Sequence, residues 1–312
     1  MEINNLLKLE LGDPVQDKNI TDFLDQDESN KVYPSIRLTS KNSFHNNKQH
    51  LFILKAKLPF GKSLWPAWWL TGTDNGEQSS LNKKWPTNGE IDVIELVNEE
   101  SQFKNVLHMC KSCNSQWKNG PKMNGNNKWG NILDCEGQYN SGCSTDGDTN
   151  VFQNLTTFEN QRGGVFACYW NPKKQNNVKI NDNDTVDILG TIKFYYWDYH
   201  EKNLDKNNGP LSKNPDQSKW EDDLLTEVRY WKGETEETDY NCKENGTNTN
   251  CNFNNLKMVF NTTVCGDWAG NVFETESGDP KAACLDYIKD STEIKKSFWE
   301  ISYIAAFDKN ID

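Results

Sequence analysis

The chain of 312 residues contains no uninterrupted apolar stretch of about eighteen residues, the length that a membrane-spanning helix needs. It also lacks an excess of positive charge, because its formal net charge is -12, and this argues against nucleic acid as a partner. Long helical periodicity and internal repeats are missing as well. Yet twelve Trp, fourteen Phe and ten Tyr are too many aromatic residues for a disordered chain. We therefore expect a folded protein that neither crosses a membrane nor binds nucleic acid.

Cysteine is absent before Cys110, and the nine cysteines are scattered over the rest of the chain. Cys110 and Cys113 form a Cys-x-x-Cys pair, but neither a second such pair nor two histidines at zinc-finger spacing accompany it. A zinc site is therefore the weaker interpretation, and disulfide bonds formed in an oxidising compartment are favoured. Because the number of cysteines is odd, at least one thiol must stay unpaired within the chain.

Five Asn-x-Ser/Thr acceptor sites agree with secretion, although an Asn-rich chain contains some by chance. They are Asn19, Asn154, Asn183, Asn245 and Asn261. The first residues, MEINNLLKLELG, lack the basic end, apolar stretch and cleavage site of a signal peptide. We expect a secreted protein whose leader has been removed, or whose N-terminus is incomplete, in preference to a cytosolic protein.

Alternating apolar residues and turn residues dominate the pattern, which indicates short strands. The predicted strands are Ser35–Ser40, Leu51–Leu58, Ala67–Gly72, Glu90–Val97, Asn105–Met109, Gly164–Trp170, Thr191–Trp197, Leu256–Thr263 and Trp299–Phe307. The last of these alternates regularly from Trp299 to Phe307, as a half-buried strand does. Polar loops are predicted at 111–150, 171–187, 200–219 and 233–255, and one short helix at Ser291–Ser297. This pattern predicts an all-β fold, a β-sandwich or jelly roll, with long loops at the rims of the sheets where a cleft can form.

Three acids interrupt the apolar segment WPTNGEIDVIELVN, which runs from Trp85 to Asn98. Charges within such a strand are costly unless they are used or paired. Glu90 and Asp92 share a face, whereas Glu95 points to the opposite face in a regular strand. A one-residue β-bulge between Asp92 and Glu95 would return Glu95 to the first face, and bulges concentrate beside active sites. Taken alone, the pattern is more typical of solvated charges on an edge strand than of a catalytic site.

The segment Asn88–Glu95, NGEIDVIE, resembles the bulged signature of glycoside hydrolase family sixteen, the laminarinases and lichenases, and is closest to that of the fungal endo-1,3(4)-β-glucanases. Six further blocks resemble the family in the same order: Ser63–Leu70, Asn105–His108, Gly163–Ala167, Pro215–Trp220, Val264–Gly270 and Phe298–Ile304. The resemblance implies a concanavalin A-like jelly roll, with a substrate cleft across the concave sheet, formed by residues 1–312 as a single catalytic domain. It implies no cofactor, and no convincing ligand set for a structural calcium ion or another metal is found.

By position, the resemblance implies that Glu90 is the nucleophile, Asp92 its supporting acid and Glu95 the general acid/base of a retaining hydrolysis. The physical requirements agree with these roles. Glu90 must be ionised to attack the anomeric carbon, and Glu95 must be protonated to assist the leaving oxygen. Acids packed together raise the pKa of one of them, which gives the proton a place to reside.

Tryptophans are candidates for stacking on sugar rings, because an indole is apolar yet suits a wet cleft. Trp85 and Trp268 are the preferred candidates, with Trp69 as a further one. We expect Trp65 and Trp68 to pack in the core instead.

Two kinds of polar residue are further candidates for the site. The family resemblance suggests that His108 reaches the site near Glu95, and a buried structural histidine is the competing interpretation. Asn98 and Asn261 are weaker candidates for binding sugar hydroxyls.

The chain also departs from the family. Met1–Asn30 is polar and unlike the family's N-terminal sequence, so an outer strand on the glycone side is expected to be missing or altered. Thr235–Cys251 resembles a variable loop. Two disulfide predictions accompany the resemblance, although spacing alone fixes no connectivity: Cys265 with Cys284 first, and then Cys135 or Cys143 with Cys110 or Cys113.

The predicted function is hydrolysis of internal β-1,3 bonds in β-glucan, and of β-1,4 bonds beside β-1,3 linkages, by a secreted monomer. The main alternative is a non-catalytic β-glucan-binding protein on the same scaffold. Such relatives typically lack the glutamates, so the presence of Glu90 and Glu95 favours the enzyme. A third interpretation is transglycosylation, with a sugar in place of water as the acceptor, and the sequence does not separate it from hydrolysis.

Overall fold

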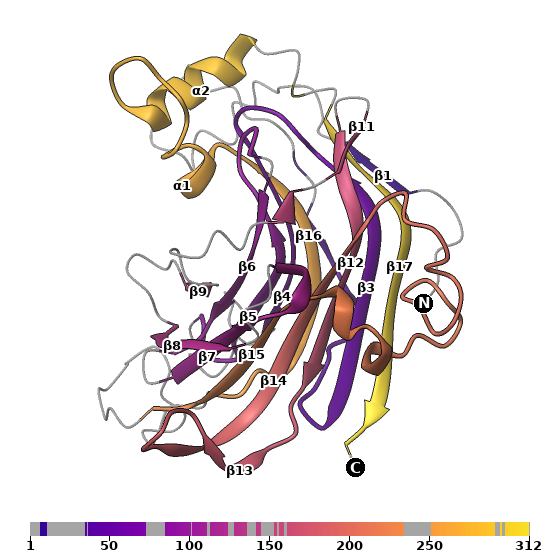
Figure 1. Cartoon of the computed structure of the whole chain (residues 1–312). Helices are drawn as coiled ribbons and strands as arrows, with labels where there is room; N and C mark the ends of the chain where they lie inside the picture. Colours follow the sequence, from indigo (N-terminus) through magenta and orange to yellow (C-terminus); the bar gives the residue numbers. More distant parts are fainter. Residues whose placement is uncertain are drawn as a thin grey trace.

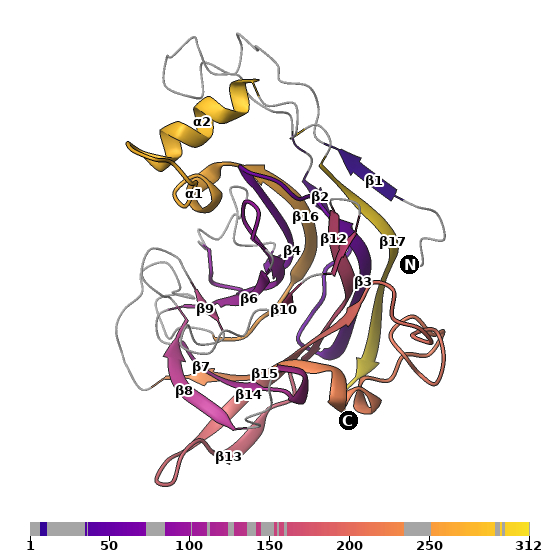
Figure 2. The ribbon, with the colours of Figure 1, turned by 45° about the horizontal axis from the view of Figure 1, so that its top comes forward.

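The strands form two antiparallel sheets that pack face to face. Apolar side chains at every second position give each sheet an apolar face, and these faces meet in the core. The computed structural model describes residues 7–10, 35, 37–72, 85–100, 102–110, 113–123, 128–135, 142–144, 153–154, 156–158, 161–233, 251–290, 294 and 297–311. Figure 2 shows that the two sheets curve together, with the smaller sheet inside the curve of the larger one. The outer surface of the smaller sheet is therefore concave.

The smaller sheet has seven strands, with the central order β10-β6-β5-β4-β16-β2 and with β9 paired to β6 (Figure 1). Its strands are β2 (Leu38–Thr39), β4 (Leu64–Gly72), β5 (Glu90–Glu95), β6 (Gln102–His108), β9 (Cys143–Ser144), β10 (Gln153–Asn154) and β16 (Leu256–Val264). Strand β5, which carries the three acids, is paired on both sides, by β4 and β6. The acids therefore lie in the interior of the sheet and not on an edge strand.

The larger sheet has ten strands, with the central order β1-β17-β3-β12-β14-β15-β7-β8, and β11 and β13 are paired to β12 and β14. Its strands are β1 (Leu7–Glu10), β3 (Lys48–Leu58), β7 (Cys113–Asn119), β8 (Trp129–Asp134), β11 (Thr156–Phe158), β12 (Gln161–Asn171), β13 (Gln175–Lys179), β14 (Thr185–Asp198), β15 (Leu224–Lys232) and β17 (Phe298–Asn310). The N-terminal strand β1 pairs with β17, so an outer strand does lie at this edge of the sheet.

Helices are few among the described residues. They are α1 (Gly266–Ala269), α2 (Pro280–Asp290) and the short 3-10 helices Pro121–Met123, Gln217–Lys219 and Glu221–Asp223. Figure 1 shows α1 and α2 together at one end of the molecule, and α1 contacts β4. None of the helices in the described part of the chain is long and apolar enough to cross a membrane.

The main core lies between the sheets and is rich in aromatic side chains. Trp68 of β4 and Trp170 of β12 are completely buried there, as predicted for Trp68. A second apolar cluster covers the other face of the larger sheet, where Leu204 and Trp220 pack over Tyr195 and Trp197 of β14. Because this second cluster covers the larger sheet, the concave face of the smaller sheet is the one that remains available to a ligand.

The all-β prediction is confirmed, and each of the nine predicted strands overlaps an observed one. Eight of the described strands were missed: β7, β8, β9 and β13 lie in segments predicted as loops, and β1, β10, β11 and β15 lie in unassigned segments. Helix α2 was also missed. The helix predicted at Ser291–Ser297 lies for the most part outside the described residues, as does the loop predicted at Thr235–Cys251.

The regular alternation predicted from Trp299 to Phe307 is wrong in one respect. The register of β17 against β3 shifts between Ile301 and Tyr303. Trp299 and Ile301 face the main core before the shift, whereas Tyr303 and Phe307 pack on the second cluster after it. An extra residue in a strand reverses the faces of all residues that follow, so one strand contributes to both clusters.

The disulfide between Cys265 and Cys284 is confirmed, with an S–S distance of 2.05 Å. The second prediction is wrong, because Cys135 is bonded to Cys143 and Cys113 to Cys251. Cys135 directly follows β8 and Cys143 opens β9, and their Cα atoms lie 4.4 Å apart, close enough for a direct bond. Cys168 is buried and, among the described cysteines, the one that is unbonded, as the odd number required.

Candidate active site

A β-bulge at Val93 turns Glu95 to the same side of the sheet as Glu90. Against β6, Asp92 pairs with Val106 and Glu95 with Lys104, so β5 spans three residues where β6 spans two. The same shift occurs against β4. The predicted bulge is thereby confirmed. Its unpaired backbone is satisfied by Asn105, whose buried side-chain amide donates to the Val93 carbonyl oxygen at 2.6 Å.

The two glutamates line one cleft on the concave face, with a volume of about 560 Å³. Its lining comes from β4, β5, β6, α1 and the segments before β5 and around β9: Trp65, Trp85, Glu90, Glu95, Lys104, Val106, His108, Gly142, Ser144, Asp267 and Trp268. Of the predicted site residues, Glu90, Glu95, Trp85, His108 and Trp268 are thus brought together. Asp92 lies beneath the surface of the cleft and is only 2 % exposed.

Glu90 is held by donors on both sides. The Trp85 indole N–H donates to its Oε2 at 3.1 Å, and the Thr71 side chain on β4 makes a second hydrogen bond. The pKa of Glu90 is raised from 4.5 to about 7, chiefly by burial and next by the negative charge of Asp92, while His108 and the two hydrogen bonds oppose the shift.

Glu95 has a matching but poorer set of donors. The Trp65 indole N–H donates to its Oε1 at 3.0 Å. Burial raises the pKa of Glu95 well above 4.5, and the negative charges of Asp92 and Glu90 act in the same direction. Because one hydrogen bond stabilises its carboxylate, against two for Glu90, Glu95 is the glutamate that keeps its proton to higher pH.

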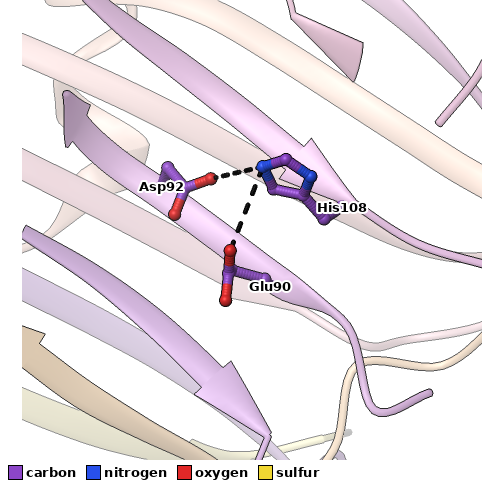
Figure 3. A group of neighbouring side chains, drawn as sticks. All are labelled: Glu90, Asp92 and His108. Atoms are coloured by element: carbon purple, nitrogen blue, oxygen red, sulfur yellow. Dashed lines mark ion pairs between the residues drawn. The ribbon is translucent and has the colours of Figure 1, made fainter. Parts of the chain in front are cut away.

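Asp92 and His108 form a pair beside Glu90 (Figure 3). His108 Nε2 lies 3.2 Å from Asp92 Oδ2 and 3.9 Å from Glu90 Oε1, an ion-pair contact in each case and not an aligned hydrogen bond. Burial raises the pKa of Asp92 well above its usual value. His108 is therefore closer to Glu90 and Asp92 than the prediction that placed it near Glu95 implies.

The position of His108 depends on a neighbouring glycine. A Cβ atom at Gly142 would lie 2.8 Å from His108 Nδ1, and the φ of Gly142 is +64°. Both facts favour glycine at this position. Gly142 adjoins Cys143, which is bonded to Cys135, so a disulfide secures the segment that packs on the imidazole.

Carboxylate and imidazole groups of this kind can also bind a metal ion. One donor atom from each of Glu90, Asp92 and His108 lies within 4.8 Å of the others, and zinc accepts such ligands. Hydrolysis by a pair of carboxyl groups such as Glu90 and Glu95 needs no metal.

The end of the cleft beside Glu95 is formed by an aromatic pair and a lysine. The rings of Trp65 and Trp268 meet edge to face, with centroids 5.6 Å apart. The ammonium of Lys104 lies over the Trp268 ring, 4.5 Å from its centroid. At the other end, the ring of Trp85 lies 5.0 Å from that of His108.

Three predicted candidates lie outside this cleft. Trp69 donates its indole N–H to Asn261 at 2.6 Å, and Arg37 lies over its ring. Asn98 accepts a hydrogen bond from the Ser63 backbone N–H and donates to the Ala269 carbonyl oxygen. These contacts give Asn98 a structural role, since it joins the entrance of β4 to α1.

The prediction that Trp65 packs in the core is wrong, because Trp65 lines the cleft and contacts Glu95. The signal was present in the sequence: Trp65 and Trp69 are four residues apart on one strand and share a face, whereas Trp68 is on the other. Lys104 was also missed, although it is two residues from Val106 on the face of β6 that His108 shares. No sequence signal indicates Gly142 or Ser144, which reach the cleft from the residue before β9 and from β9 itself.

The XgeA-like catalytic GH16 domain is the family whose model matches the chain, over residues 2–181 and 216–307. The fold and the paired glutamates are those of a glycoside hydrolase domain. The chain belongs to this XgeA-like family within glycoside hydrolase family sixteen. The match begins at residue 2. It therefore includes the polar N-terminal segment up to Asn30, whose sequence contains none of the family motifs described above.

Two fungal relatives illustrate the similarity. The chain is 26% identical to probable glycosidase C21B10.07 of Schizosaccharomyces pombe over 284 residues, which cover 88% of this chain and 54% of that protein. It is 28% identical to endo-1,3(4)-beta-glucanase xgeA of Emericella nidulans over 250 residues, which cover 78% of this chain and 32% of that protein. The chain thus spans about half, or less, of the length of these relatives.

Solved structures share the fold. Laminarinase 16A of Phanerochaete chrysosporium, which holds 6-O-glucosyl-laminaritriose in its donor and acceptor sites, superposes with a TM-score of 0.57 and 20% identity over 96% of this chain and 83% of that one. An elongating β-1,3-glucosyltransferase of family sixteen superposes with a TM-score of 0.55 and 21% identity over 98% of both chains. The predicted jelly roll is thereby confirmed.

Proposed function

We propose that this domain is an endo-β-glucanase that hydrolyses internal β-1,3 bonds, and β-1,4 bonds beside β-1,3 linkages, with retention of the β-configuration. One observation carries the proposal: the bulge at Val93 directs Glu90 and Glu95 into a single cleft lined by tryptophans. The names of the fungal relatives and of the solved laminarinase support a β-glucan as the substrate.

In the first step, the Glu90 carboxylate attacks the anomeric carbon while Glu95 protonates the departing glucosidic oxygen. The donors around Glu90 favour its ionised form, and the less supported Glu95 retains the proton. The bond between C1 and the leaving oxygen breaks, and an ester between C1 and Glu90 forms.

In the second step, Glu95 acts as the base. Having given up its proton, it removes one from water, which attacks C1 and releases Glu90. The Trp65 N–H stabilises the Glu95 carboxylate between the two steps. Two displacements at the same carbon return the β-configuration.

Asp92 and His108 control the charge around the nucleophile. Asp92 raises the pKa of both glutamates by its negative charge, whereas His108 lowers them when it is protonated. The two groups with these opposing effects on the glutamates, Asp92 and His108, lie only 3.2 Å apart. We assign them supporting roles and leave the bond-making to Glu90 and Glu95.

Tryptophans at both ends of the cleft suit a substrate that extends past the cleaved bond. Trp85 lies at the Glu90 end and Trp268 at the Glu95 end, and each is bound to a neighbour that fixes its ring. Indole rings bind the apolar faces of sugars. Trp69, on the same face of β4 as Trp65 but outside the cleft, is a candidate for binding a more distant sugar.

The proposal also includes the domain organisation, the oligomeric state and the location of the protein. We propose that residues 1–312 form one catalytic domain that acts as a monomer and is secreted. Three described disulfides support an oxidising compartment, because such bonds are rare in the cytosol.

Substitution of the nucleophile tests the proposal and separates it from a non-catalytic glucan-binding protein. Glu90→Gln should lower kcat on laminarin at least about a thousandfold while leaving oligosaccharide binding within a few fold. Release of reducing ends and calorimetric titration with laminarihexaose measure the two effects. Glu300→Gln is the matched control, since Glu300 is a strand glutamate paired with Lys57 on the other sheet, and should keep full activity. Normal turnover by Glu90→Gln would contradict the assignment.

A further inference from the structure

Lys104 lines the cleft between Glu95 and Trp268. It is the β6 residue paired with Glu95 of β5, and their side chains leave neighbouring strands on the same face. Its ammonium lies over the Trp268 ring, 4.5 Å from the ring centroid. A cation at that distance is attracted to the negative face of the ring.

Trp268 cannot readily move away from Lys104. It lies in α1, which follows the disulfide-bonded Cys265. The preceding residue, Asp267, is paired with Lys281 of α2 at 2.7 Å, and the carbonyl oxygen of the next residue, Ala269, accepts a hydrogen bond from Asn98. A ligand that needs this face of Trp268 must therefore displace the lysine and not the ring.

Trp268 lies on the Glu95 side of the site. Trp65 joins them, because its indole N–H bonds to Glu95 and its ring meets Trp268 edge to face. In a retaining glycosidase the leaving group departs from the side of the acid/base, and the acceptor enters there in the second step. A sugar that stacks on Trp268 is therefore an acceptor sugar, if Glu95 has the role given above.

We propose that Lys104 is a specificity-determining residue that favours water over a sugar acceptor by covering the stacking face of Trp268. The inference rests on the proposed function and deepens it. In the second step the ester bond between Glu90 and C1 breaks, a bond forms from the acceptor oxygen to C1, and the acceptor proton passes to Glu95. Water and a sugar hydroxyl undergo the same exchange, so their relative occupancy decides between hydrolysis and transfer.

The size of the effect follows from the strength of the contact. A partly exposed cation–π contact, which an acceptor sugar must displace, weakens sugar binding by about two- to fivefold. Lys104→Met removes the charge and keeps an unbranched apolar stem of similar length, whereas Lys104→Arg keeps a cation over the ring. The two variants therefore separate the charge from the volume of the side chain.

The experiment supplies laminaritetraose as both donor and acceptor and measures the ratio of longer to shorter products by mass spectrometry. Lys104→Met should raise this ratio about two- to fivefold at a fixed substrate concentration. Lys104→Arg should leave it close to the wild-type value. Lys118→Met is the matched control, because Lys118 also lies near a tryptophan, 6.0 Å from the Trp129 ring centroid, but outside the cleft.

A double variant tests whether Trp268 mediates the effect. In a Trp268→Ala background, Lys104→Met should no longer raise the ratio. An unchanged or lower ratio in Lys104→Met, or a rise that persists without Trp268, would overturn the inference while the hydrolase assignment stands. A wild-type enzyme that formed neither shorter nor longer products would overturn the proposed function, and this inference with it.

Discussion

Trp65 of β4 donates its indole N–H to Glu95 of β5 at 3.0 Å, across two adjacent strands of the concave sheet. The bond is possible because the bulge at Val93 returns Glu95 to the face that Trp65 occupies. A donor at this place favours the carboxylate of Glu95 over its acid form. Trp65 therefore limits how far burial raises the pKa of the proposed acid/base.

Trp65→Phe keeps an aromatic ring beside Trp268 but removes this donor. The pKa of Glu95 should rise, so the basic limb of the kcat/KM profile should move to higher pH. The carboxylate needed in the second step is less stable, so kcat should fall by roughly tenfold. The pH dependence of laminarin hydrolysis measures both effects. Trp68→Phe is the control, because the Trp68 indole is buried in the core. This variant should leave the pH of the basic limb unchanged. A basic limb that stays unmoved in Trp65→Phe would contradict this role.

Asp92→Asn tests the electrostatic coupling among the acids. The negative charge of Asp92 raises the pKa of both Glu90 and Glu95. Its removal should therefore lower both, and both limbs of the kcat/KM profile should shift to lower pH. Titration of activity between pH 3 and pH 9 follows the shift. A shift of either limb to higher pH would contradict this electrostatic coupling.

Deletion of single residues in β5 tests the bulge. Val93 is the extra residue, so its deletion leaves Glu90, Asp92 and Glu95 on the concave face and removes one buried side chain, at a cost of roughly 2–4 kcal/mol. Deletion of Ile91 instead moves Glu90 to the core face, where its charge is unpaired. We expect the first variant to unfold cooperatively at a lower temperature and the second to fail to fold, as measured by circular dichroism. Equal tolerance of the two deletions would argue against the bulge.

Asn105→Ala tests the support of the same bulge without changing the length of the strand. The Val93 carbonyl oxygen loses its donor and stays buried, which costs roughly 1–3 kcal/mol. We expect a lower Tm and a fall in kcat with KM little changed, because the direction of Glu95 becomes less fixed. Asn114→Ala, on strand β7 of the larger sheet, is a control that should alter neither constant.

Stability should depend on pH through Glu90. Its pKa is raised from 4.5 to about 7 by burial, so ionisation of the folded protein is less favourable than ionisation of the unfolded chain. Folding stability is therefore lost as pH rises through this window. Glu90→Gln should escape that loss, with a gain in stability that grows from pH 4.5 and levels off above pH 7 at about 3 kcal/mol. Urea unfolding at pH 4.5, 6 and 8 measures the gain. An equal gain at all three values would show that burial of the charge is not its cause.

Parts of the fold and of the site could be predicted because they follow physically from the spacing of residues along one strand. The odd spacing of Glu95 from Glu90 required a bulge if both were to face one side, and the structure contains it. Trp65 could have been placed in the cleft by the same parity, since Trp68 was correctly assigned to the core.

Other features depend on contacts between distant segments. Strand β7 has the polar sequence CNSQWKN, which carries little apolar alternation and is a strand because β15 and β8 pair with it. The bond between Cys135 and Cys143 could not be predicted, because spacing does not determine connectivity. Lys104 gains its relevance from Trp268, which reaches it from α1 more than a hundred and fifty residues later.

The stereochemistry of the first product tests the central claim most directly. Double displacement through Glu90 and Glu95 releases a sugar with the β-configuration, before mutarotation mixes the anomers. Proton NMR spectra recorded during the first minutes of laminarin hydrolysis should show the β-anomeric signal first and the α-signal growing later. Initial release of the α-anomer would contradict the account, because a nucleophile at Glu90 cannot produce it.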